Sequence, residues 1–69
     1  MTENEKKQAL IDLGLKIKEA RLEHGLSQEE LASICGFDRT YISLVERGKR
    51  NLSYLNLLRL MKVLEKDSN

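Results

Sequence analysis

Residues 27–48 read SQEELASICGFDRTYISLVERG, and this segment determines how the chain folds. Its pattern predicts two short helices joined by a tight turn. Ser27 is followed three residues later by a glutamate, which is the pattern of a capping box at the start of a helix. Gly36 can adopt the left-handed backbone that ends this helix, and Asp38 is the expected N-cap of a second helix that runs to Arg47.

Small and apolar residues at fixed positions are expected to hold these two helices together. Ala32 is small because the second helix crosses close to the first at that point. Phe37, Ile42 and Val45 supply the apolar contacts that set the angle between the helices. Two short helices joined by three or four residues that include glycine are typical of the helix-turn-helix, whose second helix enters the major groove of DNA. The segment therefore indicates a DNA-binding function.

Amphipathic patterns predict one further helix on each side of this segment. The N-terminal helix is expected from about Glu5 to His24, and Gly14 weakens it locally because glycine disfavours helix. Its inward face is formed by Leu10, Leu13, Ile17 and Ala20. The last helix, 54–64, begins after its expected N-cap Ser53. Its core residues are expected to be Tyr54, Leu57, Leu60, Met61 and Leu64.

Length and composition favour one small domain that is held together by packing. The chain has 69 residues, so the expected fold is all-α, a compact bundle of four short helices with five as the alternative, in a single domain over residues 1–69. The single cysteine, Cys35, cannot close an internal disulfide, and one His with one Cys does not give the spacing of a zinc site. We expect Cys35 to be a buried apolar residue and His24 to cap the end of its helix.

The sequence lacks the residue patterns on which catalysis depends. Paired carboxylates, a nucleophile with a base, and a glycine-rich phosphate loop are missing at any meaningful spacing. The chain is therefore predicted not to be an enzyme and to need no cofactor, metal or small-molecule ligand. Its polar start and the charges that interrupt its apolar runs indicate neither a signal peptide nor a membrane span, so we expect a cytoplasmic protein without a membrane partner.

The charge of the chain is unevenly distributed along its length. The net charge is +1, but residues 1–36 carry five Lys or Arg against seven Asp or Glu, and residues 37–69 carry seven against four, which gives −2 and +3. The basic half contains the predicted second helix of the pair and the loop after it. A basic surface of this kind is typical of contact with phosphates, but a run of charge taken alone is more often just a solvated face.

Helical geometry predicts which side chains the helix 38–47 exposes once its apolar residues face inward. Arg39, Ser43 and Arg47 lie on one stripe at positions i, i+4 and i+8, with Thr40 and Leu44 beside them. Arginine can bind guanine through two hydrogen bonds, hydroxyl groups can bond to base edges, and an apolar side chain can contact a thymine methyl group. Direct readout of bases is thus expected from this stripe, with Arg39 as the best candidate.

Residues beside this helix are expected to contact the DNA backbone. Gln28 opens the preceding helix, where its amide and the free backbone N–H groups of the helix start can hold a phosphate. Lys49, Arg50 and Asn51 would reach the backbone from the following loop. Double-stranded operator DNA is therefore the expected partner.

Residues 13–64 closely resemble the DNA-binding domain of the lambda-type phage repressors and Cro proteins. Within that family, the segments DRTYIS (38–43) and ERGKRN (46–51) are most similar to the controller proteins of bacterial restriction-modification systems. The resemblance implies homodimers that bind two-fold symmetric, palindromic operators and regulate transcription. The phosphate contacts that it implies are Gln28 and Tyr41; the base contacts are Arg39, Thr40 and Ser43 or Leu44; and the residues that help to hold the DNA are Arg47 and Arg50.

The same resemblance implies a structural ion pair. An arginine late in the first helix pairs with a glutamate late in the third helix of this family, and Arg21 and Glu46 occupy those positions. A paired arginine beneath the recognition helix would orient that helix without touching DNA. Arg21 is therefore expected to have a structural role.

The dimer surface leaves two interpretations open. Controllers of this type carry a fifth helix that builds most of their dimer interface, whereas this sequence continues for only a few residues after the helix 54–64. The spare apolar residues of that helix, Leu55, Leu58 and Val63, are the candidate dimer interface, and Leu15 and Leu22 are also spare. Single exposed aliphatic residues are ordinary, however. The alternative function is an antitoxin or phage-type repressor module that acts partly through protein contacts of the helix 54–64.

Overall fold

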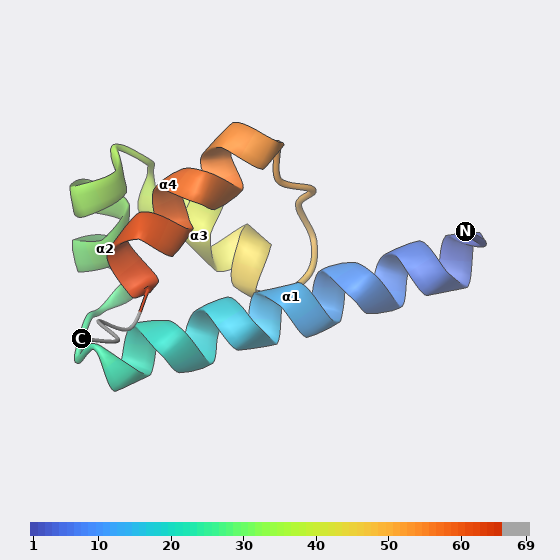
Figure 1. Ribbon diagram of the computed structural model, residues 1–69, viewed down its shortest axis with the longest axis horizontal. Helices are drawn as coiled ribbons and strands as arrows, with labels where there is room; N and C mark the ends of the chain where they lie inside the picture. Colours follow the sequence, from blue (N-terminus) through green and yellow to red (C-terminus); the bar gives the residue numbers. More distant parts are fainter. Residues whose placement is uncertain (66–69) are drawn as a thin grey trace.

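A computed structural model describes residues 1–65, and four helices and no strands occur in that range. The helices are α1 (Glu3–Glu23), α2 (Gln28–Cys35), α3 (Arg39–Glu46) and α4 (Tyr54–Leu64). α1 lies along one side of the other three, and its N-terminal turns project beyond them (Figure 1). The predicted all-α bundle of short helices is confirmed. Within the described part, no helix is both long and apolar enough to cross a membrane.

Capping hydrogen bonds define where most of these helices begin. The hydroxyl of Ser27 accepts from the backbone N–H of Glu30 at 3.0 Å, and the Glu30 carboxylate accepts from the N–H of Ser27 at 2.8 Å, which confirms the predicted capping box. Thr2 and Glu5 form a second capping box, so α1 begins at Glu3, two residues earlier than predicted. Ser53 caps α4 through a 3.1 Å bond from the N–H of Asn56, as expected.

Asp38 differs from these three caps. It occupies the N-cap position of α3 with an extended backbone, but its side chain makes no capping hydrogen bond, so that detail of the prediction is wrong. The N–H of Tyr41, which a capping side chain would bind, donates instead to the carbonyl oxygen of Asp38 at 3.0 Å. The tight first turn of α3 therefore leaves the Asp38 carboxylate free for solvent.

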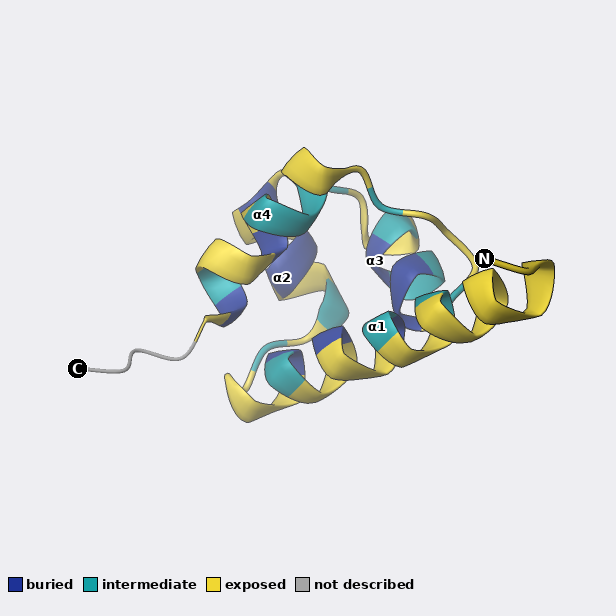
Figure 2. Cartoon of the chain, turned by 45° about the vertical axis from the view of Figure 1, so that its right-hand side comes forward, coloured by how far each residue is buried: buried dark blue, intermediate teal, exposed yellow. Residues whose placement is uncertain are grey.

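The core lies between α2, α3, α4 and the second half of α1, and Figure 2 shows the buried segments on their inward faces. Leu31, Ile42 and Leu60 are completely buried, and Val45 is nearly so. Ile17, Ala32, Cys35 and Leu64 complete the buried cluster. Most inward residues predicted from helical periodicity are therefore in the core or packed against it.

Two residues of α4 that were predicted to be in the core are exposed instead. Tyr54 is 73% exposed and Met61 is 52% exposed. Tyr54 is the first residue of α4, and only the later part of that helix, at Leu60 and Leu64, is buried. Met61 lines a groove that remains open to solvent between α1 and α4. The periodicity of α4 was therefore correct, but its inward face is narrower and begins later than predicted.

The turn between α2 and α3 depends on a glycine. Gly36 has a φ of +77°, in the left-handed region that favours glycine, and it ends α2. The N–H of Phe37 donates back to the carbonyl oxygen of Ala32 at 2.8 Å, which closes the turn. This geometry directs the chain into α3 and confirms the predicted helix-turn-helix.

Gly14 marks the place where α1 and α3 cross in backbone contact. A Cβ atom at this position would lie 2.5 Å from the carbonyl oxygen of Val45 and 2.6 Å from that of Glu46. Gly14 is buried, so the glycine permits a close approach that no other residue could allow without movement. Its role is therefore packing, in addition to the local weakening of α1 that the sequence predicts.

Candidate nucleic-acid interface

α3 presents one polar face to solvent and buries the opposite face. Ile42, Val45 and the side chain of Glu46 are buried, whereas Arg39, Thr40 and Arg47 are exposed. Ser43 and Leu44 are half-buried at the edges of the exposed face. Guanidinium and hydroxyl groups are therefore gathered on one side of a short helix, in an arrangement suited to the base edges of a major groove.

A buried ion pair joins α3 to α1. Arg21 and Glu46 are only 6% and 5% exposed, and two nitrogens of the guanidinium donate to the two carboxylate oxygens at 2.7 and 3.1 Å. The remaining terminal nitrogen of Arg21 donates to the carbonyl oxygen of Leu26 at 2.8 Å. The pair is bidentate and fully hydrogen-bonded, so it fixes α3 against α1. Arg21 and Glu46 thus form the ion pair that the family resemblance implied.

Gln28 connects the ion pair to the exposed face of α3. Its amide nitrogen donates to Glu46 Oε1 at 3.0 Å, and its amide oxygen accepts from Arg39 Nη1 at 3.5 Å. Gln28 is half-buried at the start of α2. The first residue of α3 is therefore tied through Gln28 to the buried charge beneath the helix, while the phosphate contact predicted for Gln28 stays a prediction.

Tyr41 lies at the centre of a second cluster on the other side of α3. Its ring packs against Phe37 with a centroid distance of 4.8 Å, and the guanidinium of Arg50 lies 5.4 Å from the ring centroid. The amide nitrogen of Asn56, in α4, donates to the Tyr41 hydroxyl at 3.1 Å. The phenol is therefore half-buried and held by the loop before α4 and by α4 itself.

Arg59 completes this cluster from α4. Its guanidinium lies 4.5 Å from the centroid of Phe37 and donates to the carbonyl oxygen of Cys35, at the C-terminal end of α2. A cation at this end of a helix interacts favourably with its dipole. Arg59 therefore fastens α4 to the turn between α2 and α3. Sequence reasoning missed both Arg59 and Asn56, because no local pattern separates them from other polar residues of an exposed helix face.

Residues 17–68 match the protein family described as Helix-turn-helix. The chain belongs to the helix-turn-helix family. Among its relatives is the control protein C.BamHI of Bacillus amyloliquefaciens, which is 46% identical over 52 residues, covering 74% of this chain and 64% of the relative. The control protein C.MunI of a Mycoplasma species is 50% identical over 48 residues, covering 68% of this chain and 65% of the relative. The chain thus spans slightly less than two thirds of each of these curated relatives.

Solved structures of controller proteins have the same fold. The restriction-modification controller C.AhdI from Aeromonas hydrophila superimposes with a TM-score of 0.82 and 43% identity over 88% of each chain. The controller C.Esp1396I, solved as a tetramer with its natural 35 base-pair operator, gives a TM-score of 0.76 and 46% identity over 86% of this chain and 78% of that one. The similarity to controller proteins that was predicted from the sequence is confirmed.

The loop residues predicted to contact the DNA backbone lie directly after α3. Lys49, Arg50 and Asn51 are exposed in the loop after α3, and Arg47 donates to the carbonyl oxygen of Ser43 at 3.3 Å.

A hollow of about 630 Å³ opens between α1 and α3. It is lined by Ile11, Leu15, Lys18, Gln28, Ser43, Glu46, Arg47 and Lys49. Lys18 of α1 was not predicted as part of this surface, because it lies outside the helix-turn-helix segment.

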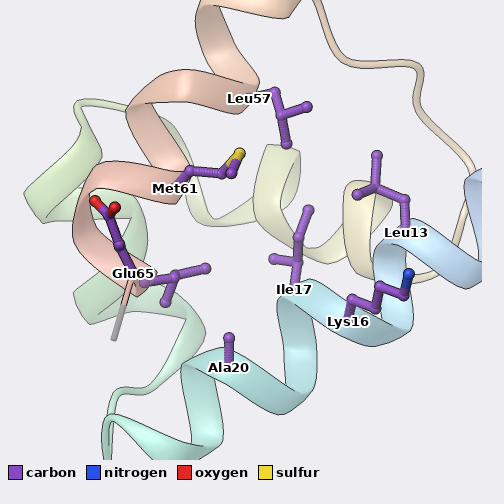
Figure 3. Close-up of a pocket in the computed structure, with 8 residues that line it drawn as sticks. Leu13, Lys16, Ile17, Ala20, Leu57, Met61 and Glu65 are labelled. Atoms are coloured by element: carbon purple, nitrogen blue, oxygen red, sulfur yellow. The ribbon is translucent and has the colours of Figure 1, made fainter. Parts of the chain in front are cut away.

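The residues predicted for a dimer surface differ in exposure. Leu55 is 70% exposed, whereas Leu58 and Val63 are half-buried, and Val63 packs against the core. A separate apolar groove of about 300 Å³ lies between α1 and α4, where Leu57 and Met61 face Ile17 (Figure 3), and none of the three residues predicted for the dimer surface lines it. The dimer interface stays a prediction for these residues.

Cys35 and His24 have the structural roles predicted from the sequence. Cys35 is buried in the core, and burial raises the pKa of its thiol while the nearby Arg59 opposes that shift. A thiol of this kind is mostly protonated and shielded, so it is a poor nucleophile. His24 is the C-cap residue of α1, and its Nδ1 lies 2.8 Å from the carbonyl oxygen of Ala20. No cluster of three metal-ligating side chains is present within residues 1–65.

Proposed function

We propose that this chain is a sequence-specific DNA-binding transcription regulator of the restriction-modification controller type. Two copies bind a palindromic operator, and each inserts α3 into the major groove. The observation that carries the proposal is the exposed face of α3, with Arg39, Thr40 and Arg47, on a helix that the buried pair of Arg21 and Glu46 holds in place. A rigid helix with a prearranged guanidinium is what direct readout of guanine requires.

Backbone contacts would position that helix in the groove. Gln28 lies on one side of α3, and the exposed cations Lys49 and Arg50 lie in the loop at its end. Contacts to phosphates on both sides of a groove fix the register of a recognition helix, and they make affinity fall as salt rises. The C-terminal concentration of positive charge supports this arrangement.

The known controllers support both the ligand and the oligomeric state. C.Esp1396I was solved with its natural operator as a tetramer. For this chain, two linked copies would multiply the weak affinity of a single small domain and require half-sites about 10 base pairs apart. A regulator of this kind acts where the DNA is, in the cytoplasm, and carries out no chemistry of its own.

Selection of binding sites from a random pool of short duplexes tests the proposal. We expect a two-fold symmetric site to be enriched and to sediment with two protein chains at moderate salt. Arg39→Ala should weaken the enrichment, whereas Lys62→Ala, which removes an exposed cation from α4, should retain it in full. Absence of enrichment above random DNA would contradict the proposal and favour a protein-interaction role, such as that of an antitoxin.

A further inference from the structure

The hydrogen bond between Asn56 and Tyr41 determines whether the tyrosine hydroxyl can donate a hydrogen bond to another partner. The Asn56 amide nitrogen donates to the hydroxyl oxygen at 3.1 Å. A tyrosine hydroxyl has one proton to donate as well as acceptor lone pairs, and an amide NH₂ group can only donate. Because Asn56 occupies an acceptor position of the hydroxyl, the proton of Tyr41 remains available for a different partner.

DNA phosphates are partners that can use this proton. A phosphate oxygen only accepts hydrogen bonds, so it requires a donor whose proton is not already engaged within the protein. Arg50 lies over the same ring, 5.4 Å from its centroid, and brings a positive charge to that side of α3. Tyr41 and Arg50 therefore form a donor pair suited to a single backbone phosphate.

α4 holds Asn56 in the position from which its amide can donate to the Tyr41 hydroxyl. The backbone N–H of Asn56 is bound by the Ser53 hydroxyl in the first turn of α4, and the side chain is half-buried. One turn later on α4, Arg59 stacks on Phe37, the aromatic neighbour of Tyr41. Residues three apart on a helix share a face, so α4 supports the ring of Tyr41 and its hydroxyl at the same time.

We propose that Asn56 is a positioning residue for DNA binding, which makes the Tyr41 hydroxyl a hydrogen-bond donor to a backbone phosphate beside Arg50. The inference rests on the proposed function and adds a residue of α4 to the machinery of the recognition surface. Asn56 does not itself touch DNA in this arrangement. Its effect must therefore pass entirely through the hydroxyl of Tyr41.

A double-mutant cycle on the dissociation constant for the selected operator tests this role. Asn56→Ala should weaken binding by about two- to tenfold, the range of one hydrogen bond. Tyr41→Phe removes the hydroxyl and keeps the ring, and in that background Asn56→Ala should have no further effect. Equal losses in both backgrounds would overturn the proposal, because Asn56 would then act without the hydroxyl.

Asn56→Asp provides a second, independent arm. Its carboxylate has the shape of the amide but accepts the Tyr41 proton, so the hydroxyl can no longer donate to a phosphate. The added negative charge also repels DNA, and the Tyr41→Phe background measures that contribution alone. We expect a larger loss with Tyr41 present than with phenylalanine; equal losses would overturn the assignment.

Two readouts separate this role from other failures. Thermal unfolding of Asn56→Ala should show a Tm lowered by only a few degrees, as expected for the loss of one hydrogen bond, and a chain that is folded at the temperature of the binding assay. A variant that is unfolded at that temperature would indicate a structural role and overturn the proposal. The wild-type chain should prefer the operator to random duplex at the same salt. If it has no such preference, the proposed function fails and this assignment with it; if the preference is intact but the cycle shows no coupling, only the role of Asn56 fails.

Discussion

Replacing Gly14 with alanine should have two opposite effects on stability: it raises the helix propensity of α1, and it disturbs the packing of α1 on α3. Considered alone, α1 should gain about 1 kcal/mol, because alanine favours helix over glycine. In the folded domain, however, the new Cβ atom would lie 2.5 Å from the carbonyl oxygen of Val45 and 2.6 Å from that of Glu46. Both are backbone atoms of α3, so they cannot rotate away as the end of a side chain would. The two helices must therefore move apart.

The size of this effect follows from the contact distances. Ordinary van der Waals contacts of a Cβ atom begin at about 3.4 Å, so the crossing has to open by on the order of 1 Å. Overpacking of this kind costs about 1–3 kcal/mol, and rigid backbone neighbours place Gly14→Ala in the upper part of that range. After the gain in propensity is subtracted, we expect a net loss of about 1–2 kcal/mol. In a domain of this size the Tm should fall by about 5–15 °C.

Thermal unfolding followed by circular dichroism measures this directly. The matched control is Ala9→Gly, at an exposed position of the same helix, where only propensity changes. That variant should lose about 1 kcal/mol, which calibrates the propensity of α1. A Gly14→Ala protein that melts at or above the wild-type temperature would refute the argument, because it would show that α1 and α3 are not in backbone contact.

Three further substitutions test separate parts of the interface. Arg39→Ala should cost about 1–3 kcal/mol on the selected operator and little on random duplex, and similar losses on both would argue against base readout. Arg50→Ala should weaken binding to all sequences alike and reduce the slope of the salt dependence by about 1, so a sequence-selective loss would contradict a phosphate contact. Arg21→Ala leaves Glu46 buried without its cation, which should cost about 3–5 kcal/mol of stability. An unchanged Tm would show that the pair has no structural role.

Local signals in the sequence were sufficient to predict the helices and the turn. The capping box at Ser27 and the left-handed turn at Gly36 depend on residues within a few positions of one another, so the sequence displays them directly. The apolar spacing of α3 likewise predicts its buried face, because helical geometry relates positions i, i+3 and i+4. The exposed face of α3, and thus most of the candidate DNA contacts, follows from the same rule.

Features that depend on contacts between distant elements could not be predicted in this way. Periodicity assigned Tyr54 and Met61 to the core because they lie on or near the apolar side of α4. It cannot predict which part of that side the other helices cover, and both residues are exposed in the structure. The packing role of Gly14 depends on a crossing with α3, more than 30 residues away. The hydrogen bond of Asn56 to Tyr41 likewise joins residues 15 positions apart on different helices.

The central claim is that the exposed face of α3 reads a DNA sequence, and the ratio of two dissociation constants tests it most directly. The wild-type chain should be titrated, at one near-physiological salt concentration, against the selected two-fold symmetric duplex and a scrambled duplex of the same length and composition. The selected site should be bound at least about 10³-fold more tightly, as is typical of specific binding. Equal affinity for the two duplexes would contradict the claim.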